Sequence, residues 1–255
     1  MEKMRKPFQG VWNIIRFNWH FYLLALVAVA AILLLDYYTG GDFYFYKNIL
    51  LLLILGSTGI TLLVSMYVYD FSGLYQFQWI KNAGDDIKTI VNINAGFDET
   101  STLLKEKFED AELIVLDFYD PALHTEISIE RARKAYPPYP GTRLVTTAHL
   151  PLEDNSADRI FVILSAHEIR NKDEQVVFFG ELRRILKPGG EIAVTEHLRD
   201  WPNFLAYNMG FFHFHSKKSW YRTFQQAGLH LAREIKITPF ITTFMLKKKW
   251  NYSLK

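Results

Sequence analysis

The sequence predicts an α/β protein in which two N-terminal transmembrane helices precede a doubly wound sheet, mostly parallel with an antiparallel last strand. Two observations predict this fold class. Long uncharged apolar segments are confined to residues 1–69 of the 255-residue chain. After residue 86, short β-rich apolar runs alternate with helical stretches, and such alternation is typical of a parallel sheet with helices on both faces.

Two apolar segments near the N-terminus have the length of transmembrane helices. Residues 21–35 and 49–69 contain no charged residue, and Trp or Tyr residues flank both segments, as at the two surfaces of a membrane. A transmembrane helix needs about 20 apolar residues, which the second segment has and the first reaches if it starts at Phe17. Two alternatives are a signal peptide, whose cleavage site at 28–30 would lie inside the apolar segment, and a buried hairpin of a soluble protein.

The basic residues near the N-terminus predict the orientation of these helices. Lys47 alone lies between them, whereas Lys3, Arg5, Lys6 and Arg16 precede the first. Because basic residues concentrate on the cytoplasmic side, both ends of the chain are expected there. The sequence thus predicts a multi-pass protein of the cytoplasmic (inner) membrane, with the lipid bilayer as a partner and the α/β domain facing the cytoplasm.

The chain divides into a membrane anchor at 1–69, an interfacial linker at 70–86 and an α/β domain at 87–255. The linker contains large apolar residues such as Leu74 and Phe77. They allow two interpretations: a segment that lies on the membrane surface, or a first helix packed on the domain.

Apolar periodicity and the positions of Gly and Pro predict the elements of the domain. Strands are expected at 87–93, 111–116, 144–147, 158–165, 191–195, 229–237 and 240–247, and helices at 99–108, 121–134, 174–186 and 219–227. The last two strands, joined by Thr238 and Pro239, form an antiparallel pair beside the parallel part of a Rossmann-like sheet. Ligands bind such sheets at the carboxyl ends of the strands, so the residues that follow the strands are the candidate site.

The composition excludes several classes of function. The formal net charge of +2, from 29 basic and 27 acidic residues, does not suggest a protein that binds nucleic acid. Without cysteine, the chain has no disulfide, zinc–thiolate site or cysteine nucleophile. The spacing H-E-x-x-H does not occur, so no metal site is predicted.

Three segments resemble one enzyme family and occur in that family's order. Residues 178–197 contain a helix, an L-K-P-G-G turn and a strand; 149–164 resemble an L-P-F-x-D-x-S-F-D motif; and 219–229 resemble the family's last helix. The family is the class I S-adenosylmethionine-dependent methyltransferases of the ubiquinone/menaquinone type (methyltransferase type 11-like), and the resemblance covers about 87–249. It implies a transferase that methylates an acceptor with S-adenosylmethionine as cofactor.

The cofactor loop departs from the family pattern of an acidic residue followed by G-x-G-x-G. Asn92 stands in the place of the acid, and only the middle glycine, Gly96, remains. Asn94 tolerates the positive φ that the turn needs, and Asp98 offers a cap for the following helix. The resemblance implies that Asp117 accepts hydrogen bonds from the ribose hydroxyls; the alternative is an acid that caps a strand end or a helix. The implied cofactor-binding residues are Asn92, Asn94, Ala95, Gly96, Asp117, Phe118, Ala148, His149 and Ser165, with Ala148 and His149 beside the adenine.

Charged residues follow the fourth and fifth strands, at the same edge of the predicted sheet. His167 is the candidate general base, because imidazole titrates near neutral pH, and Glu168 or Glu196 would orient it. His197 and Arg199 would shape the acceptor pocket, with residues 204–214 as its apolar wall. The alternative is a buried polar network that braces the two loops.

Two hypotheses for the function follow. The first is a membrane-anchored S-adenosylmethionine-dependent methyltransferase that acts on a lipid-soluble or membrane-associated small-molecule acceptor. The second is a non-catalytic, methyltransferase-like binding or scaffold protein at the membrane. The dense polar cluster favours the first hypothesis and the degenerate glycine loop favours the second. A NAD-dependent dehydrogenase is disfavoured, because the G-x-G-x-x-G motif does not occur.

Overall fold

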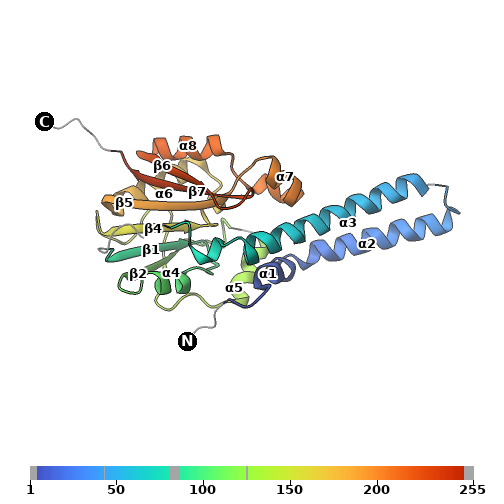
Figure 1. Cartoon of the computed structure of the whole chain (residues 1–255), viewed down its shortest axis with the longest axis horizontal. Helices are drawn as coiled ribbons and strands as arrows, with labels where there is room; N and C mark the ends of the chain where they lie inside the picture. The colour runs from blue at the N-terminus through green and yellow to red at the C-terminus, as the bar shows by residue number, and fades with distance from the viewer. Residues whose placement is uncertain (1–4, 43, 81–86, 125, 250–255) are drawn as a thin grey trace.

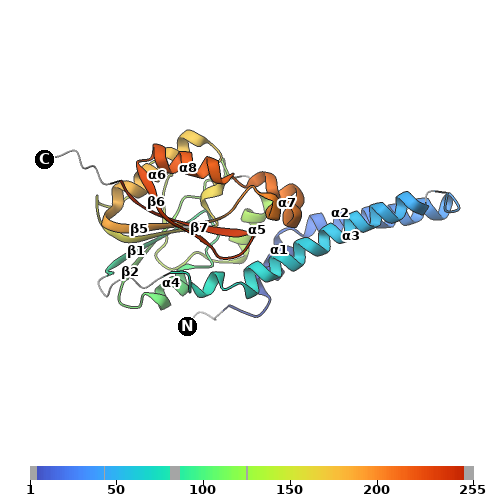
Figure 2. The same cartoon turned by 45° about the horizontal axis from the view of Figure 1, so that its top comes forward.

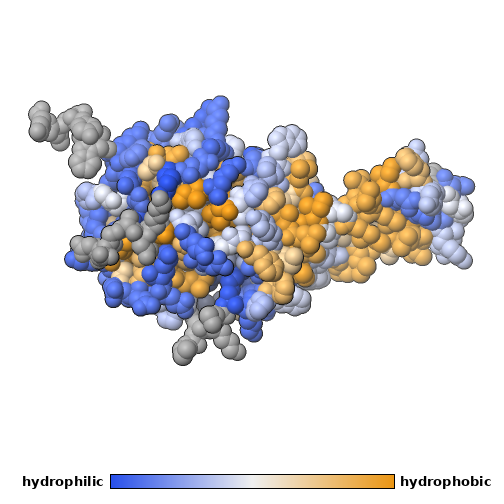
Figure 3. Space-filling model, in the orientation of Figure 1, coloured by the Kyte–Doolittle hydropathy of each residue, from blue (hydrophilic) through white to orange (hydrophobic). Residues whose placement is uncertain are grey.

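The computed structural model describes residues 5–42, 44–80, 87–124 and 126–249. A helical hairpin of α2 (Trp19–Tyr38) and α3 (Tyr44–Met66) projects from one end of an α/β domain (Figure 1). Both helices are long and apolar enough to cross a membrane, with mean hydropathies of 2.1 and 2.4, and almost none of their side chains is buried. A core hairpin of a soluble protein would be mostly buried, so the exposure argues against that alternative. Figure 3 shows the apolar surface along the hairpin and its polar tip.

A short helix that the sequence did not predict precedes the hairpin. α1 (Gln9–Phe17) packs beside the π-helical turn Tyr67–Phe71 that continues α3. The Asp70 carboxylate accepts hydrogen bonds from the backbone N–H groups of Gly10 and Val11, at 2.7 and 2.9 Å, and thereby caps the first turn of α1. A Cβ on Gly10 would collide with Tyr69, so the glycine permits this close approach.

The domain is built on one seven-stranded sheet in the order β3-β2-β1-β4-β5-β7-β6. Its strands are β1 (Thr89–Asn94), β2 (Glu112–Asp117), β3 (Arg143–Leu144), β4 (Ala157–Ile163), β5 (Leu186–His197), β6 (Leu229–Lys236) and β7 (Ile241–Lys248). The strands from β3 to β5 are parallel, whereas β7 is antiparallel to both β5 and β6. The predicted fold class is confirmed: a Rossmann-like, mostly parallel sheet follows two candidate membrane-spanning helices.

Helices and one segment of turns cover the two faces of the sheet (Figures 1 and 2). On one face, α6 (Lys172–Ile185) and α8 (Lys217–Gln226) pack fully buried aromatic side chains such as Phe179 and Trp220 against the strands. On the other face, α4 (Ser101–Lys107) packs beside the chain segment at 74–80. The carboxyl ends of the parallel strands face the base of the hairpin.

The segment at 74–80 decides between the two interpretations of the linker, for the residues that the structure describes. Leu74, Phe77 and Ile80 are buried against the domain, so they do not lie on a membrane surface. Leu74–Gln76 forms a single 3₁₀ turn rather than a longer helix. The remainder of the predicted linker, 81–86, lies outside the described residues.

Several elements differ from the prediction. α5 (Ile127–Ala135) begins six residues later than predicted, because Asp120 holds residues 121–124 in a turn. β3 has only two residues, and β5 takes in the predicted turn at 187–190. α7 (Trp201–Tyr207) and the 3₁₀ helix Asn208–His213 lie where the sequence predicted only an apolar wall.

Candidate functional site

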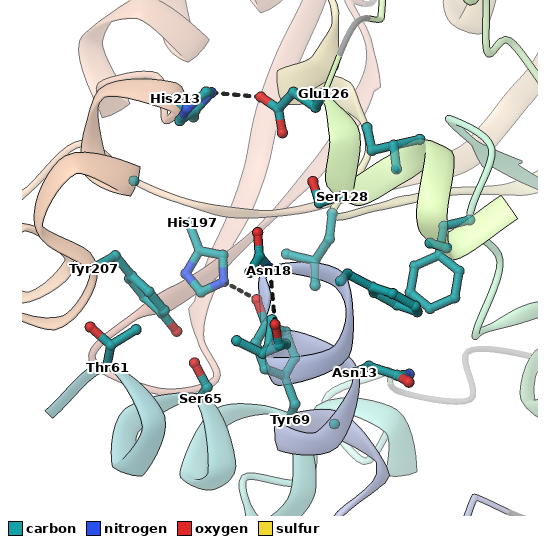
Figure 4. A pocket seen from close by; sticks show the side chains of 18 of the residues that line it. Asn13, Asn18, Thr61, Ser65, Tyr69, Glu126, Ser128, His197, Tyr207 and His213 are labelled. Atoms are coloured by element: carbon teal, nitrogen blue, oxygen red, sulfur yellow. Dashed lines mark hydrogen bonds and ion pairs between the residues drawn. The ribbon is translucent and has the colours of Figure 1, made fainter. Parts of the chain in front are cut away.

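A cavity of about 1060 Å³ lies between the carboxyl edge of the sheet and the base of the hairpin. Its walls come from both parts of the chain: α1, α2, α3 and the turn after α3 on one side, and β1, β4, β5, α5 and the segment 207–214 on the other. Figure 4 shows Thr61 and Ser65 of α3 and Tyr69 of the following turn facing His197 and Tyr207 of the domain. The site is therefore built where the helical hairpin meets the sheet edge.

The loop after β1 is held by its own side chains. The Asn92 amide donates hydrogen bonds to the hydroxyls of Thr100 and Ser101, at 2.9 and 2.8 Å. Asp98 accepts hydrogen bonds from the backbone N–H groups of the same two residues, both at 2.9 Å, and so caps α4 as its position suggested. The prediction that Asn92 contacts the cofactor is not supported, because its amide is used within the loop.

The turn at the end of β1 depends on Gly96 rather than on Asn94. Gly96 has a φ of 91°, whereas Asn94 is not among the residues with positive φ. Asn94 instead closes the turn, since its Oδ1 accepts a hydrogen bond from the Gly96 N–H at 3.0 Å. Its Nδ2 is buried and has no hydrogen-bond partner within the described residues, and Asn94 lines the cavity.

Asp117 is buried at the end of β2, where the resemblance placed a ribose-binding carboxylate. Its Oδ1 accepts a hydrogen bond from the Tyr119 N–H at 2.9 Å, and its Oδ2 accepts one from Arg133 Nη1 at 2.5 Å. The Arg133 guanidinium also lies 4.4 Å from the Tyr119 ring centroid, and a Cβ on Gly96 would lie 2.8 Å from Arg133 Nη1. Arg133 therefore covers both Asp117 and Gly96.

The remaining predicted cofactor residues lie apart from the cavity. Ala148 and His149 are exposed on the turn that follows β3. Ala95 is buried in the loop after β1 and does not line the cavity. Phe118 packs between His124 and Phe178, with ring centroids 5.6 and 5.3 Å away. The Ser165 hydroxyl donates a hydrogen bond to the backbone oxygen of Ile93 at 3.0 Å, and so ties β4 to β1. Of the predicted cofactor set, Asn94 alone lines the cavity.

His167 lies between two carboxylates at the ends of β4 and β5. Its Nδ1 is 2.7 Å from Glu196 Oε2 and its Nε2 is 3.1 Å from Glu168 Oε1. Burial lowers the pKa of His167, but the charges of Glu196 and Glu168 outweigh it and hold the pKa well above its usual value. The raised pKa favours the imidazolium, whose two nitrogens face the two carboxylates. Neither nitrogen is free in this arrangement, and the role of His167 as general base stays a prediction.

His197 has the opposite protonation state. Burial lowers its pKa to about 4, so the ring is neutral at pH 7. Its Nδ1 lies 3.0 Å from the backbone oxygen of Phe240, an acceptor, so the proton is assigned to Nδ1. Nε2 then accepts a hydrogen bond from the Tyr69 hydroxyl at 2.9 Å, as Figure 4 shows. His197 lines the cavity, and its hydrogen bond with Tyr69 links the segment that follows α3 to the domain.

Arg199 does not line the cavity, which corrects its predicted role. Its side chain is exposed and donates a hydrogen bond to the backbone oxygen of Phe212 at 2.5 Å. Arg199 therefore holds the segment 208–213 in place and lies outside the pocket wall. Glu168, by contrast, is buried and lines the cavity beside His167.

Several lining residues come from the anchor and were not predicted. α3 carries Ser57, Thr61 and Ser65 at intervals of four residues, which places them on one face of an otherwise apolar helix. That polar stripe is the sequence signal that would have found them. Glu99 also lines the cavity and was not predicted from the sequence. Its carboxylate accepts hydrogen bonds from Asn13 at 3.1 Å and from Tyr75 at 2.9 Å.

Comparisons with known proteins agree with this geometry. Residues 91–194 match the family model of a methyltransferase domain. The enzyme class that this match supports is an S-adenosylmethionine-dependent methyltransferase, with S-adenosylmethionine as the expected cofactor. A search of curated proteins gave no match.

Among solved structures, an S-adenosylmethionine-dependent methyltransferase from Methanosarcina mazei aligns with 68% of this chain and 97% of its own at 14% identity, with a TM-score of 0.51. The PH0226 protein from Pyrococcus horikoshii aligns with 69% of this chain and 86% of its own at 15% identity, with a TM-score of 0.47. At 14% identity, the likeness to the Methanosarcina mazei structure shows a similar fold and nothing further.

The residues at the sheet edge fit this cofactor if two side chains move. Asp117 is a buried carboxylate at the end of β2, Gly96 gives the close backbone approach, and Asn94 presents an unpartnered amide. Arg133 covers the first two, and its side chain is 33% exposed. Rotation of Arg133 toward solvent would free the Asp117 carboxylate, whereas the Tyr119 ring also lies against Gly96 and would have to move as well.

Proposed function

We propose that the chain is a membrane-anchored S-adenosylmethionine-dependent methyltransferase of the cytoplasmic membrane, multi-pass and with its domain facing the cytoplasm. Its acceptor is a lipid-soluble or membrane-associated small molecule. The single observation that carries the proposal is the cavity with walls from both the methyltransferase domain and the candidate membrane-spanning hairpin. A water-soluble acceptor would not require that α3 line the pocket.

Two further features support a site at the membrane surface. The Thr61 hydroxyl of α3 donates a hydrogen bond to the backbone oxygen of Ala206 in α7 at 2.7 Å, so α7 is fixed against the hairpin. Large apolar side chains of α7 and the following 3₁₀ helix are exposed beside it: Trp201, Leu205, Met209 and Phe212. An exposed apolar patch next to a hairpin of this kind is suited to contact with lipid.

The lining side chains give the domain a means to remove a proton. S-adenosylmethionine supplies an electrophilic methyl group on a sulfonium. The acceptor atom would form a bond to that methyl carbon while the carbon–sulfur bond breaks and S-adenosylhomocysteine leaves. The acceptor's proton would pass to the Glu168 carboxylate, which lines the cavity. His167, held protonated by Glu196, donates to Glu168 and orients it, so His167 is a positioning residue in this proposal.

A second candidate, a non-catalytic methyltransferase-like binding or scaffold protein at the membrane, is favoured by one observation. Arg133 pairs with Asp117, and Asn92 replaces the acid of the family pattern. A chain that had lost cofactor binding would tolerate both features.

Methyl transfer in membranes separates the two candidates. Vesicles that contain the full-length protein are incubated with methyl-labelled S-adenosylmethionine and lipid extract, and label is counted in the organic phase. We expect labelling by wild type and by the exposed control Glu153→Gln, and a turnover reduced by about 10²–10⁴-fold in Glu168→Gln, with unchanged cofactor affinity. Label that enters only water-soluble compounds would refute the lipid-soluble acceptor, and absence of transfer with every extract would favour the scaffold.

A further inference from the structure

The wall of the cavity contains acidic side chains but no lysine or arginine, among the residues that the structure describes. Glu99, Glu126 and Glu168 line it, and Glu196 lies directly behind His167. Sites that hold phosphate or carboxylate groups in proteins usually supply arginine or lysine donors. The one cationic side chain of the described wall is His167, and both of its nitrogens already face Glu168 and Glu196, so the wall offers no lysine or arginine donor to an anionic head group.

The charges around the cavity leave one carboxylate in surplus. Glu99 pairs with Arg5 at 2.9 Å. Arg170 lies 2.7 Å from Glu126 and 3.9 Å from Glu168, and His167 lies between Glu168 and Glu196 at 3.1 and 2.7 Å. The three carboxylates of this second group exceed its guanidinium and imidazolium by one negative charge, and Glu168 and Glu196 are buried.

The same wall offers a buried polar atom that lacks a partner. Asn94 Nδ2 is buried without a hydrogen-bond partner in the described part of the chain. Asn94 lines the cavity together with Ser65 and Tyr207, whose hydroxyls interact with each other, and Figure 4 shows Ser65 and Tyr207 turned toward its interior. Buried polar atoms are normally hydrogen-bonded, so the Asn94 amide beside these hydroxyls indicates a ligand with polar groups.

The rest of the wall is apolar. Phe17 and Phe97 lie edge to face with ring centroids 5.6 Å apart, and Leu164 and Phe214 also line the cavity. The lining extends along α2 as far as Tyr22. A molecule that fills it therefore has a polar head and a substantial apolar part.

We infer that the cavity binds an amphiphile whose head group is uncharged or cationic and donates hydrogen bonds, such as a phenol or an amine, and that it excludes phosphate and carboxylate head groups. The head lies at Glu168 and the Asn94 amide, and the apolar part lies along α1 and α2. This inference rests on the proposed function in that the amphiphile is its methyl acceptor. It narrows the acceptor class, because lipids that present a phosphate do not qualify.

Three short amphiphiles with the same tail test the selectivity: hexylamine, 4-hexylphenol and hexyl phosphate. Their binding to the full-length protein in detergent is measured by equilibrium dialysis at pH 7, against detergent alone. We expect the amine and the phenol each to bind at least about 10-fold more tightly than the phosphate, because like charges brought together at a buried site are strongly unfavourable. Equal or tighter binding of hexyl phosphate would overturn the inference.

Two variants place the selectivity in this cavity. Glu168→Gln should weaken hexylamine binding by about 10-fold or more and the phenol less, since a charge-assisted hydrogen bond is lost, whereas Glu153→Gln should change neither. Ser128 of α5 points into the cavity (Figure 4), and Ser128→Lys should strengthen hexyl phosphate binding and weaken hexylamine binding. If both variants kept the wild-type order, the amphiphile would bind elsewhere and the inference would be wrong.

Binding of S-adenosylmethionine, measured on the same samples, separates this inference from the proposed function. Cofactor binding together with preferred binding of hexyl phosphate would overturn the inference alone. Selective amine and phenol binding without cofactor binding would overturn the methyltransferase proposal, and the cavity would then be the site of a lipid-binding protein.

Discussion

Arg133→Ala should increase the affinity for S-adenosylmethionine. In the structure, Arg133 Nη1 lies 2.5 Å from the buried Asp117 carboxylate, and the same guanidinium covers Gly96. A hydrogen bond to a charged group contributes about 1.5–3 kcal/mol, and the exposure of one third of the Arg133 side chain reduces this to roughly 1–1.5 kcal/mol. The cofactor must displace that interaction, so its removal should lower Kd by about 5–15-fold.

The assay is a calorimetric titration of the full-length protein with S-adenosylmethionine. Lys134→Ala is the matched control, since Lys134 is the next residue of α5, is exposed and pairs only with Glu130 in the described residues. It should leave Kd unchanged. Weaker binding by Arg133→Ala would show that Arg133 is a cofactor ligand, and an unchanged Kd would show that it does not compete. Either result would refute the reasoning.

Three other predictions address the anchor and the site. Reporter fusions after residue 42 and after residue 255 should report opposite sides of the membrane, with the second in the cytoplasm; a periplasmic C-terminus would contradict the topology. Gly10→Ala should destabilise the protein by about 1–3 kcal/mol, because a Cβ there collides with the chain after α3, whereas Gly180→Ala, with open space around it, should not; denaturant titration compares the two. The pKa of His197 is about 4 in the folded state against about 6.5 in the unfolded state, so the folded protein takes up fewer protons as pH falls. The free energy of unfolding should therefore fall by about 2 kcal/mol between pH 7 and pH 5 on account of this residue, and His197→Gln should lose that part of the slope. His167 does not offset this loss of stability, because its pKa is raised in the folded state and the stabilisation that results is already present below pH 6.5. An identical slope in wild type and variant would show that His197 is not buried in neutral form.

The strands and long helices of the domain follow from local sequence patterns. The helix now seen as α6 was predicted from apolar residues at helical spacing, which is a property of about four turns of chain. α1 was missed because it has nine residues and begins only when Asp70, sixty residues later, caps it. Its formation depends on tertiary structure, which no local pattern reports.

The site was predicted less completely, again for a physical reason. His167, Glu168 and Glu196 could be grouped from the sequence because they follow two neighbouring strands, but that His167 contacts both carboxylates at once depends on how the two strand ends pack. Likewise, Asp117 follows from its place at a strand end, whereas its partner Arg133 comes from a separate helix. The cavity itself requires the hairpin and the sheet to meet, and their relative placement is not encoded in any short motif.

The most direct test of the account is whether the full-length protein binds S-adenosylmethionine at the β1–β2 edge of the sheet. Calorimetry on protein in lipid nanodiscs should give saturable binding of one cofactor per chain, and Asp117→Ala should weaken it by about 10–150-fold, since one charge-assisted hydrogen bond to a ribose hydroxyl is lost. If wild type and Arg133→Ala both show no binding at millimolar S-adenosylmethionine, the chain is not a methyltransferase, and the non-catalytic membrane protein is the correct account.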